Sequence, residues 1–179
     1  MSAGGIAGVL RRELAVHRDG RGHLSEYFRV DWETGIEPQQ WHVLDCLPGS
    51  LRGVHLHLAH VDYKVTLVGR QLLALVDLRL GSPTEERVEL HDVTGDELVG
   101  ITIPPGVGHG VYSFDHSTSV VAASLLYDGS DDFECLWSDP ELGIGWPSAP
   151  TLLSERDRTA PTLAEVRERL GERLRIPAS

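Results

Sequence analysis

Between Gln39 and Tyr127 the chain alternates short apolar segments with clusters of turn residues. The segments are rich in Val, Leu and Ile, and they are Trp41–Leu47, Leu51–Leu58, Tyr63–Val68, Gln71–Leu80, Arg87–Val93, Leu98–Ile103, Gly110–Phe114 and Val120–Tyr127. Turn sequences such as Pro48-Gly49, Gly69-Arg70 and Gly95-Asp96 separate them. Many short strands with regularly spaced turns are typical of a sandwich or barrel. We therefore predict an all-β fold across the middle of the chain.

The pattern changes near the C-terminus. Thr162 is followed three residues later by Glu165, which is the order of a capping box at a helix N-terminus. Apolar residues then recur at helical spacing, at Leu163, Val166, Leu170 and Leu174. We predict one short amphipathic helix over about 162–174 that packs against the barrel.

Length and composition limit the classes of protein to consider. With 179 residues, we expect a single domain over 1–179, with an N-terminal strand region at 1–30 and a barrel over about 31–150. The net charge of -11 argues against a nucleic-acid partner. No segment approaches the ~20 apolar residues of a membrane span. Cys46 and Cys135 are too few for a disulfide framework, so we expect reduced, structural thiols in a cytoplasmic protein.

Four possible metal ligands lie next to turns. His55 and His57 are two residues apart and share one face of a strand, Asp62 follows after a short turn, and His109 follows the turn at Pro104–Gly106. Imidazole and carboxylate together suit first-row transition metals. We predict that His55, His57, Asp62 and His109 hold one divalent ion, which would be iron, manganese, nickel or zinc. We expect His60, in the turn, to face solvent.

Motifs from about Arg18 to Leu163 also carry a family resemblance. They include Leu51–His55, Val76–Arg79, Gly81–Thr84, Ile103–Gly106, Leu136–Pro140, Leu142–Pro147 and Leu153–Asp157. In these motifs the chain resembles the dTDP-4-dehydrorhamnose 3,5-epimerase family of sugar-nucleotide enzymes, which belongs to the cupin superfamily. The resemblance implies a cupin jelly-roll barrel and a homodimer joined through an extended N-terminal strand.

The resemblance also implies roles for individual residues. His55 matches the base that removes a proton beside a sugar ketone, and Asp157 matches the aspartate that orients it. Arg52 matches an arginine that stabilises the enolate. Further positions match residues that line the nucleotide or its phosphates: Arg21, Glu26, Gln40 and Tyr127. We add His42, near Gln40, to these substrate-binding candidates.

Two catalytic positions of the family pattern are changed in this chain. The tyrosine that acts as the acid falls at Val121 or Ala122, and neither can donate a proton. The lysine falls at Asp62, so Lys64, two residues along, is the candidate replacement. Asp62 also departs from the cupin consensus, which has glutamate at this ligand position. A bound divalent ion could supply the positive charge that the lysine has lost, as a Lewis acid.

We therefore predict an isomerase, an epimerase-like enzyme of deoxysugar or secondary metabolism that uses a bound divalent metal. Its substrate would be a small molecule, either a keto-sugar nucleotide or a related metabolite. The predicted catalytic residues are His55, Asp157, Lys64 and Arg52. Three alternatives stay open: a metal-free epimerase that uses a His–Asp pair, a metal-dependent oxygenase, and a non-catalytic sugar-nucleotide binding protein.

Overall fold

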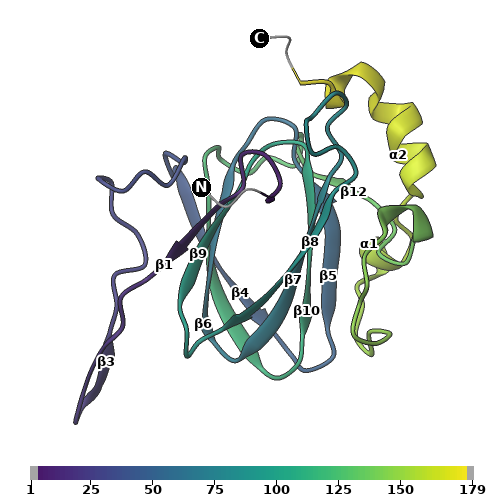
Figure 1. The fold of residues 1–179 in the computed structure, drawn as a ribbon. Coiled ribbons are helices and arrows are strands. Elements are labelled where there is room, and N and C mark those ends of the chain that lie inside the picture. The colour runs from purple at the N-terminus through teal and green to yellow at the C-terminus, as the bar shows by residue number, and fades with distance from the viewer. Residues whose placement is uncertain (1–3, 177–179) are drawn as a thin grey trace.

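A computed structural model describes residues 4–176, so residues 1–3 of the expected N-terminal region lie outside the described part. Two five-stranded antiparallel sheets form the walls of a jelly-roll barrel (Figure 1). The first sheet has the order β1 (Leu10–Glu13), β9 (Val99–Ile103), β6 (Asp62–Val68), β11 (Ser117–Ala123) and β4 (Gln40–Cys46). The second has the order β12 (Phe133–Glu134), β5 (Leu51–Leu56), β10 (Val107–Ser113), β7 (Arg70–Asp77) and β8 (Val88–Thr94). The predicted all-β cupin fold is confirmed.

A small hairpin lies outside these two sheets. It consists of β2 (His17–Asp19) and β3 (Gly22–Leu24), which pair only with each other among the described strands. In Figure 1 the hairpin extends away from the barrel, beyond β1, at the lower left. Its residues are exposed throughout, so the hairpin adds nothing to the core of this chain.

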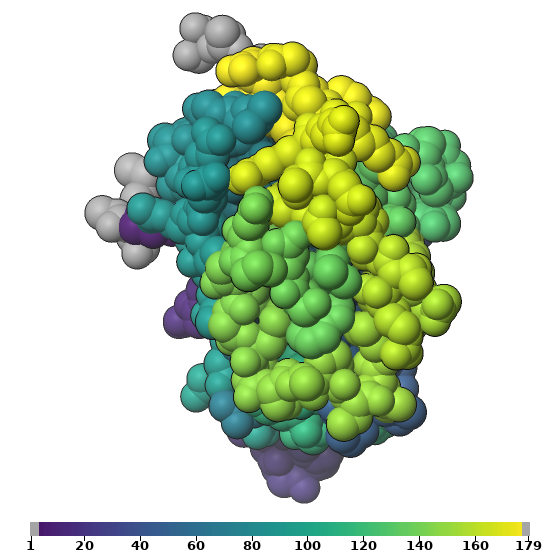
Figure 2. All heavy atoms as spheres, turned by 90° about the vertical axis from the view of Figure 1, so that its right-hand side faces the viewer, coloured from purple at the N-terminus to yellow at the C-terminus, as the bar shows by residue number. Residues whose placement is uncertain are grey.

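The C-terminal segment covers the outer face of the second sheet. A single turn of helix, α1 (Glu155–Arg158), precedes α2 (Leu163–Leu170), and two 3-10 turns, η1 (Pro140–Leu142) and η2 (Gly171–Leu174), complete it. The predicted capping box of Thr162 and Glu165 is present. Figure 2 shows this segment, in green and yellow, spread over one face of the molecule. The helix ends at Leu170, earlier than predicted, because Gly171 is a poor helix former and a 3-10 turn follows it.

Alternate residues of each strand point to opposite faces, which gives the barrel two different surroundings. On the outside of the second sheet, Val54, Leu56, Val76 and Leu78 pack in one cluster with Leu163, Val166 and Leu170 of α2. Inside the barrel, one part is filled by a second apolar cluster that includes Leu73, Leu75, Ile101, Ile103 and Val107. The rest of the interior holds the cavity described below, which polar and apolar side chains line together.

One glycine allows β5 and the central strand of the second sheet, β10, to approach closely. Gly53 in β5 has φ +121°, a conformation that side chains disfavour. A Cβ atom here would lie 2.7 Å from the Cα of Gly110 in β10. The absence of a side chain therefore permits the pairing in which His55 lies opposite His109.

The strand predicted over Val120–Tyr127 ends earlier, at Ala123. Ala123 pairs with Gln40 and Asp62, which are the first residues of β4 and β6. Beyond Ala123 the ladder ends with a bond from the Ser124 N–H to the carbonyl of Val61, and the chain then forms a loop that lines the cavity. The other predicted strands are present, with their ends shifted by a few residues.

The cysteines and the helices complete the description. Cys46 and Cys135 are both free and buried, and burial raises the pKa of the Cys135 thiol to about 12. None of the helices between residues 4 and 176 is long and apolar enough to cross a membrane.

Candidate active site

A cavity of about 460 Å³ opens inside the barrel. Its walls come from β4, β5, β6, β9, β10 and β11, and the loop at Leu125–Asp132 lines one side. Its lining combines imidazoles and carboxylates with apolar side chains, as small-molecule sites commonly do.

A histidine–aspartate pair connects the cavity to the C-terminal segment. His55 in β5 lines the cavity, and its Nε2 lies 2.8 Å from Oδ1 of Asp157 in α1. Ser154 donates a hydrogen bond of 2.7 Å to the other carboxylate oxygen of Asp157. Burial raises the pKa of Asp157, but its contacts with His55 and Ser154 lower it on balance. An ionised Asp157 accepts the Nε2–H of His55, which leaves the lone pair on Nδ1.

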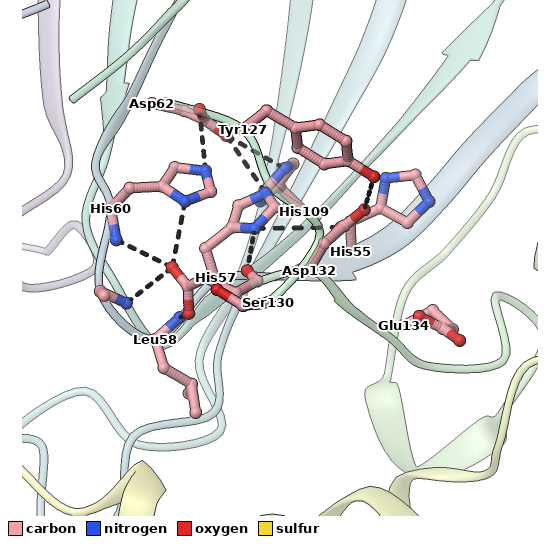
Figure 3. Close-up of polar contacts among 12 residues, drawn as sticks. His55, His57, Leu58, His60, Asp62, His109, Tyr127, Ser130, Asp132 and Glu134 are labelled. Atoms are coloured by element: carbon pink, nitrogen blue, oxygen red, sulfur yellow. Dashed lines mark hydrogen bonds and ion pairs between the residues drawn. The ribbon is translucent and has the colours of Figure 1, made fainter. Parts of the chain in front are cut away.

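A second group of imidazoles surrounds Asp62 at the start of β6. The Nε2 atoms of His57 and His109 both lie 3.5 Å from Oδ2 of Asp62. The Nε2 of His60 lies 3.5 Å from the other oxygen, Oδ1. Figure 3 shows these three imidazoles turned toward Asp62, with His55 apart from them beside Asp132. The structure therefore brings three nitrogen donors to one carboxylate.

Asp131, in the loop after β11, organises the turn that carries two of these imidazoles. Its carboxylate accepts the backbone N–H groups of Leu58, Ala59 and His60 at 2.8 to 3.0 Å. The Nδ1 of His60 donates to the same carboxylate at 3.0 Å, and the Nδ1 of His57 donates to the backbone carbonyl of Asp131 at 2.8 Å. One residue thus orients both rings.

Burial and neighbouring charge determine the protonation of this cluster. Burial lowers the pKa of His57, although Asp62 acts in the opposite direction. Burial, together with the charge of His57, lowers the pKa of His109 to about 4. Burial lowers the pKa of His60, but Asp62 and Asp131 raise it on balance. Burial raises the pKa of Asp62, but the three imidazoles lower it on balance. At neutral pH the cluster holds an ionised carboxylate with at least two neutral imidazoles.

This geometry corrects two expectations about the metal ligands. His60 does not face solvent: its side chain is 12% exposed and lies between Asp62 and Asp131. His55 does not join the group around Asp62, because its Nε2 is bound to Asp157 and no His55 nitrogen in the described chain lies within 4 Å of Asp62. The expected set of His55, His57, Asp62 and His109 is replaced by a cluster of His57, His60, Asp62 and His109.

Lys64 also faces the cavity, two residues beyond Asp62 on the same side of β6. Its Nζ donates to Gln71 Oε1 at 2.7 Å and to the hydroxyl of Ser119. Burial lowers the pKa of Lys64 to about 7. The side chain is held in a polar cage in the barrel interior.

The expected substrate-binding residues divide into two groups. Gln40, His42, Arg52 and Tyr127 line the cavity. Arg21 and Glu26 do not: Arg21 is bound to Asp19 in the exposed β2–β3 hairpin, and Glu26 is exposed and bound to Arg29. Both residues belong to the segment between β1 and β4, which forms the separate hairpin β2–β3 and joins neither sheet of the barrel.

The two residues expected at the place of the family's tyrosine acid, Val121 and Ala122, are apolar and lie on opposite faces of β11. Val121 lines the cavity opposite Lys64, whereas Ala122 is buried in the cluster on the outer face of the first sheet. Within residues 4–176, Tyr127 is the one tyrosine that lines the cavity, and it lies 65% exposed on the loop after β11. The cavity therefore has no buried phenol among the described residues.

Sequence reasoning missed three residues of the site. His60 was assigned to solvent, and Asp131 and Asp132 were not considered. Asp132 lines the cavity and forms an ion pair of 2.7 Å with Arg156. The one sequence signal for Asp131 and Asp132 is the run of acidic and small residues at Asp128–Asp132, which indicates a loop after a strand. This run does not reveal that Asp131 binds His60, which lies 71 residues earlier in the chain.

The jelly-roll barrel, with a His–Asp pair at a cavity inside it, defines a cupin with a candidate general base. Sequence comparison gives the family. The profile described as dTDP-4-dehydrorhamnose 3,5-epimerase matches residues 4–165. The chain therefore belongs to this family of dTDP-sugar epimerases, as its resemblance implied.

Individual relatives agree with this assignment. The dTDP-4-dehydro-6-deoxyglucose 3-epimerase of Streptomyces bikiniensis is 34% identical over 93% of this chain and 89% of its own. The structure of the 3'-monoepimerase ChmJ from the same organism, in complex with dTDP-quinovose, matches with a TM-score of 0.84 at 34% identity, over 93% of this chain and 88% of that one. The structure of NovW, a 4-keto-6-deoxy sugar epimerase of Streptomyces spheroides, matches with a TM-score of 0.86 at 29% identity, over 92% and 87%.

Proposed function

We propose that this isomerase removes a proton beside the ketone of a dTDP-linked 4-keto-6-deoxysugar, with His55 as the base. The observation that carries the proposal is the 2.8 Å bond between His55 Nε2 and Asp157 at the wall of the cavity. Because Asp157 accepts the Nε2–H, Nδ1 keeps the lone pair that a base requires. As the proton is taken up, the same carboxylate stabilises the imidazolium.

The cavity supports a sugar-nucleotide substrate. Its volume of about 460 Å³ is suited to a small molecule. Arg52 offers a cation at the wall, and it also lines a second groove, together with His55 and with residues that include Asp45 and Asp157. Two relatives act on or bind dTDP-sugars. We assign the diphosphate to Arg52, and the remainder of the nucleotide to Gln40, His42 and Tyr127.

Deprotonation produces an enolate oxygen, which needs a positive partner. The family's lysine is replaced by Asp62, and the neighbouring Lys64 lies in its polar cage. We retain Arg52 and Lys64 as candidates for this partner. We also retain the divalent ion expected from the sequence, whose ligands would now be His57, His60, Asp62 and His109.

The apolar Val121 at the acid position limits the outcome of the reaction. Without an acid on the opposite face of the sugar, the proton returns slowly or to the face it left. We expect isotope exchange beside the ketone to be faster than net inversion, and inversion at one carbon at most.

The test uses dTDP-4-keto-6-deoxyglucose in deuterated buffer, with exchange and product stereochemistry followed by NMR. We expect exchange with the wild-type protein and its loss, by about 10²-fold or more, in His55→Asn. His116→Asn is the matched control, because His116 also contacts an aspartate, Asp45, at 3.1 Å but lies exposed outside the cavity. Tight substrate binding without exchange would instead show a binding protein and refute the proposed activity.

We also propose that the chain works as a homodimer. The support is the hairpin β2–β3, which extends away from its own barrel (Figure 1). The pairing of Asp19 with Gly22 puts Arg21 in the turn of this hairpin. A second copy would give the hairpin a surface to pack against and would bring Arg21 to a cavity. Sedimentation of the whole chain beside a variant with Arg18–Leu24 shortened to a tight turn tests this: we expect a dimer for the first and a monomer for the second.

A further inference from the structure

We propose that His57, His60, Asp62 and His109 form a binding site for one divalent transition-metal ion, separate from the His55–Asp157 pair. The four residues come from the turn after β5, the start of β6 and the middle of β10. Their side chains are 10% to 15% exposed, so the site is largely shielded from water while it lines the cavity.

The distances fit a cation better than they fit hydrogen bonds. Each of the three Nε2 atoms lies 3.5 Å from an oxygen of Asp62, whereas an N–H···O bond spans about 2.7–3.2 Å. Nitrogen and oxygen donors lie about 2.0–2.2 Å from a zinc ion, so two donors in tetrahedral arrangement are about 3.4 Å apart. The ligand atoms of His57, His60 and Asp62 all lie within 4.8 Å of one another, and His109 joins this group through its contact with Asp62.

The Nδ1 atoms of the three histidines face hydrogen-bond acceptors, as they usually do in metal-bound histidines. The Nδ1–H of His57 donates to the carbonyl of Asp131 at 2.8 Å, and that of His60 donates to its carboxylate at 3.0 Å. The Nδ1 of His109 faces the carbonyl of Val107 at the longer distance of 3.4 Å. Since carbonyl and carboxylate oxygens only accept, each Nδ1 carries the proton and each Nε2 can present a lone pair toward Asp62. This outer hydrogen bond is the usual companion of a ligating imidazole.

The donor set also indicates the class of ion. Three imidazoles with one carboxylate suit zinc, cobalt, nickel, iron or copper, whereas calcium and magnesium prefer oxygen ligands. Asp62 stands where the family pattern has a lysine, so an ion here would restore positive charge at that point of the cavity. Its part in the reaction rests on the proposed function: a bound ion would supply a Lewis acid near the ketone oxygen.

The experiment measures binding without substrate. Protein treated with chelator and then freed of it is titrated with Co²⁺, followed by visible absorption, and with Zn²⁺, followed by calorimetry. We expect one equivalent of each ion to bind, and neither Mg²⁺ nor Ca²⁺ to compete at millimolar concentration. Failure of the wild-type protein to bind either transition metal with micromolar or better affinity would overturn the inference.

Variants identify the ligands. We expect His60→Gln and Asp62→Asn to weaken Zn²⁺ binding at least 100-fold, and Asp131→Asn to weaken it about 10- to 100-fold through the orientation of His60. His55→Asn and the exposed control His116→Asn should stay within threefold of the wild type. The opposite pattern, loss in His55→Asn and retention in His60→Gln, would show that the ligand set is wrong. Circular dichroism checks that each variant is folded. If Asp62→Asn does not fold, the Zn²⁺ affinity of His60→Gln decides whether the ligand set is correct.

This test separates the metal site from the proposed function. One equivalent of bound metal with no isotope exchange leaves the site standing and refutes the activity. Isotope exchange that depends on His55, in protein that binds no transition metal, leaves the activity standing and refutes the site.

Discussion

Replacement of Asp157 by asparagine changes the protonation of His55 with almost no change in shape. Ser154 donates to one oxygen of Asp157 at 2.7 Å, and His55 faces the other at 2.8 Å. An asparagine that keeps its carbonyl toward Ser154 presents its amide N–H to Nε2 of His55. The proton of the ring then moves to Nδ1, and the base loses its lone pair.

The expected loss can be worked out from this contact. A hydrogen bond to a charged partner contributes about 1.5–3 kcal/mol, and about 1.36 kcal/mol corresponds to a factor of ten in rate. Loss of the carboxylate in the transition state therefore slows exchange roughly 10- to 150-fold. The unfavourable tautomer adds to this, so we predict a total loss of about 10²- to 10⁴-fold, the range for general base catalysis.

The assay is the rate of deuterium incorporation beside the ketone at saturating substrate. Asp92→Asn is the control, because Asp92 pairs with Arg70 on the exposed surface, away from the cavity, and should leave the rate unchanged. An Asp157→Asn variant that is folded and exchanges within threefold of the wild type would refute the role of the pair.

Three further predictions concern stability, metal and stereochemistry. Asp77 is fully buried and accepts from Arg79, Ser82 and Thr84, so Asp77→Asn should cost about 3–5 kcal/mol in urea unfolding at pH 7. Burial raises the pKa of Asp77, but these donors lower it on balance below the ordinary value of 3.8. The stabilisation from the ionised carboxylate is therefore present above pH 3.8 and is lost as the pH falls through the lower pKa of the folded protein. The difference in unfolding free energy between the wild type and Asp77→Asn should narrow in acid. An unchanged gap at pH 3 would count against this account. Zn²⁺ at about 100 times its Kd should stabilise the wild type by about 2.7 kcal/mol in thermal unfolding and Asp62→Asn far less; equal shifts would place the ion elsewhere. Val121→Tyr puts a phenol into the cavity and should raise the ratio of inverted product to exchange, measured by NMR, and an unchanged ratio would show that Val121 is not the acid position.

Much of the fold and part of the site were predictable from the sequence. Alternating apolar positions and turn residues predicted the strands, because a strand with one buried face requires this period. The capping box and its apolar stripe predicted α2. The pattern around Leu51–His55, through the family resemblance, also predicted that His55 and Asp157 meet, although 102 residues separate them.

The sequence by itself therefore determined the barrel, the His–Asp pair and the presence of imidazoles near Asp62. Only the tertiary structure decided which imidazoles face that carboxylate. β5 ends at Leu56, so His57 and His60 lie in a turn whose conformation no strand periodicity specifies. Asp131, 71 residues later along the chain, holds that turn through its backbone amides and rotates His60 inward. Hydrogen bonds between segments so far apart depend on how the sheets close into a barrel, which local patterns do not encode.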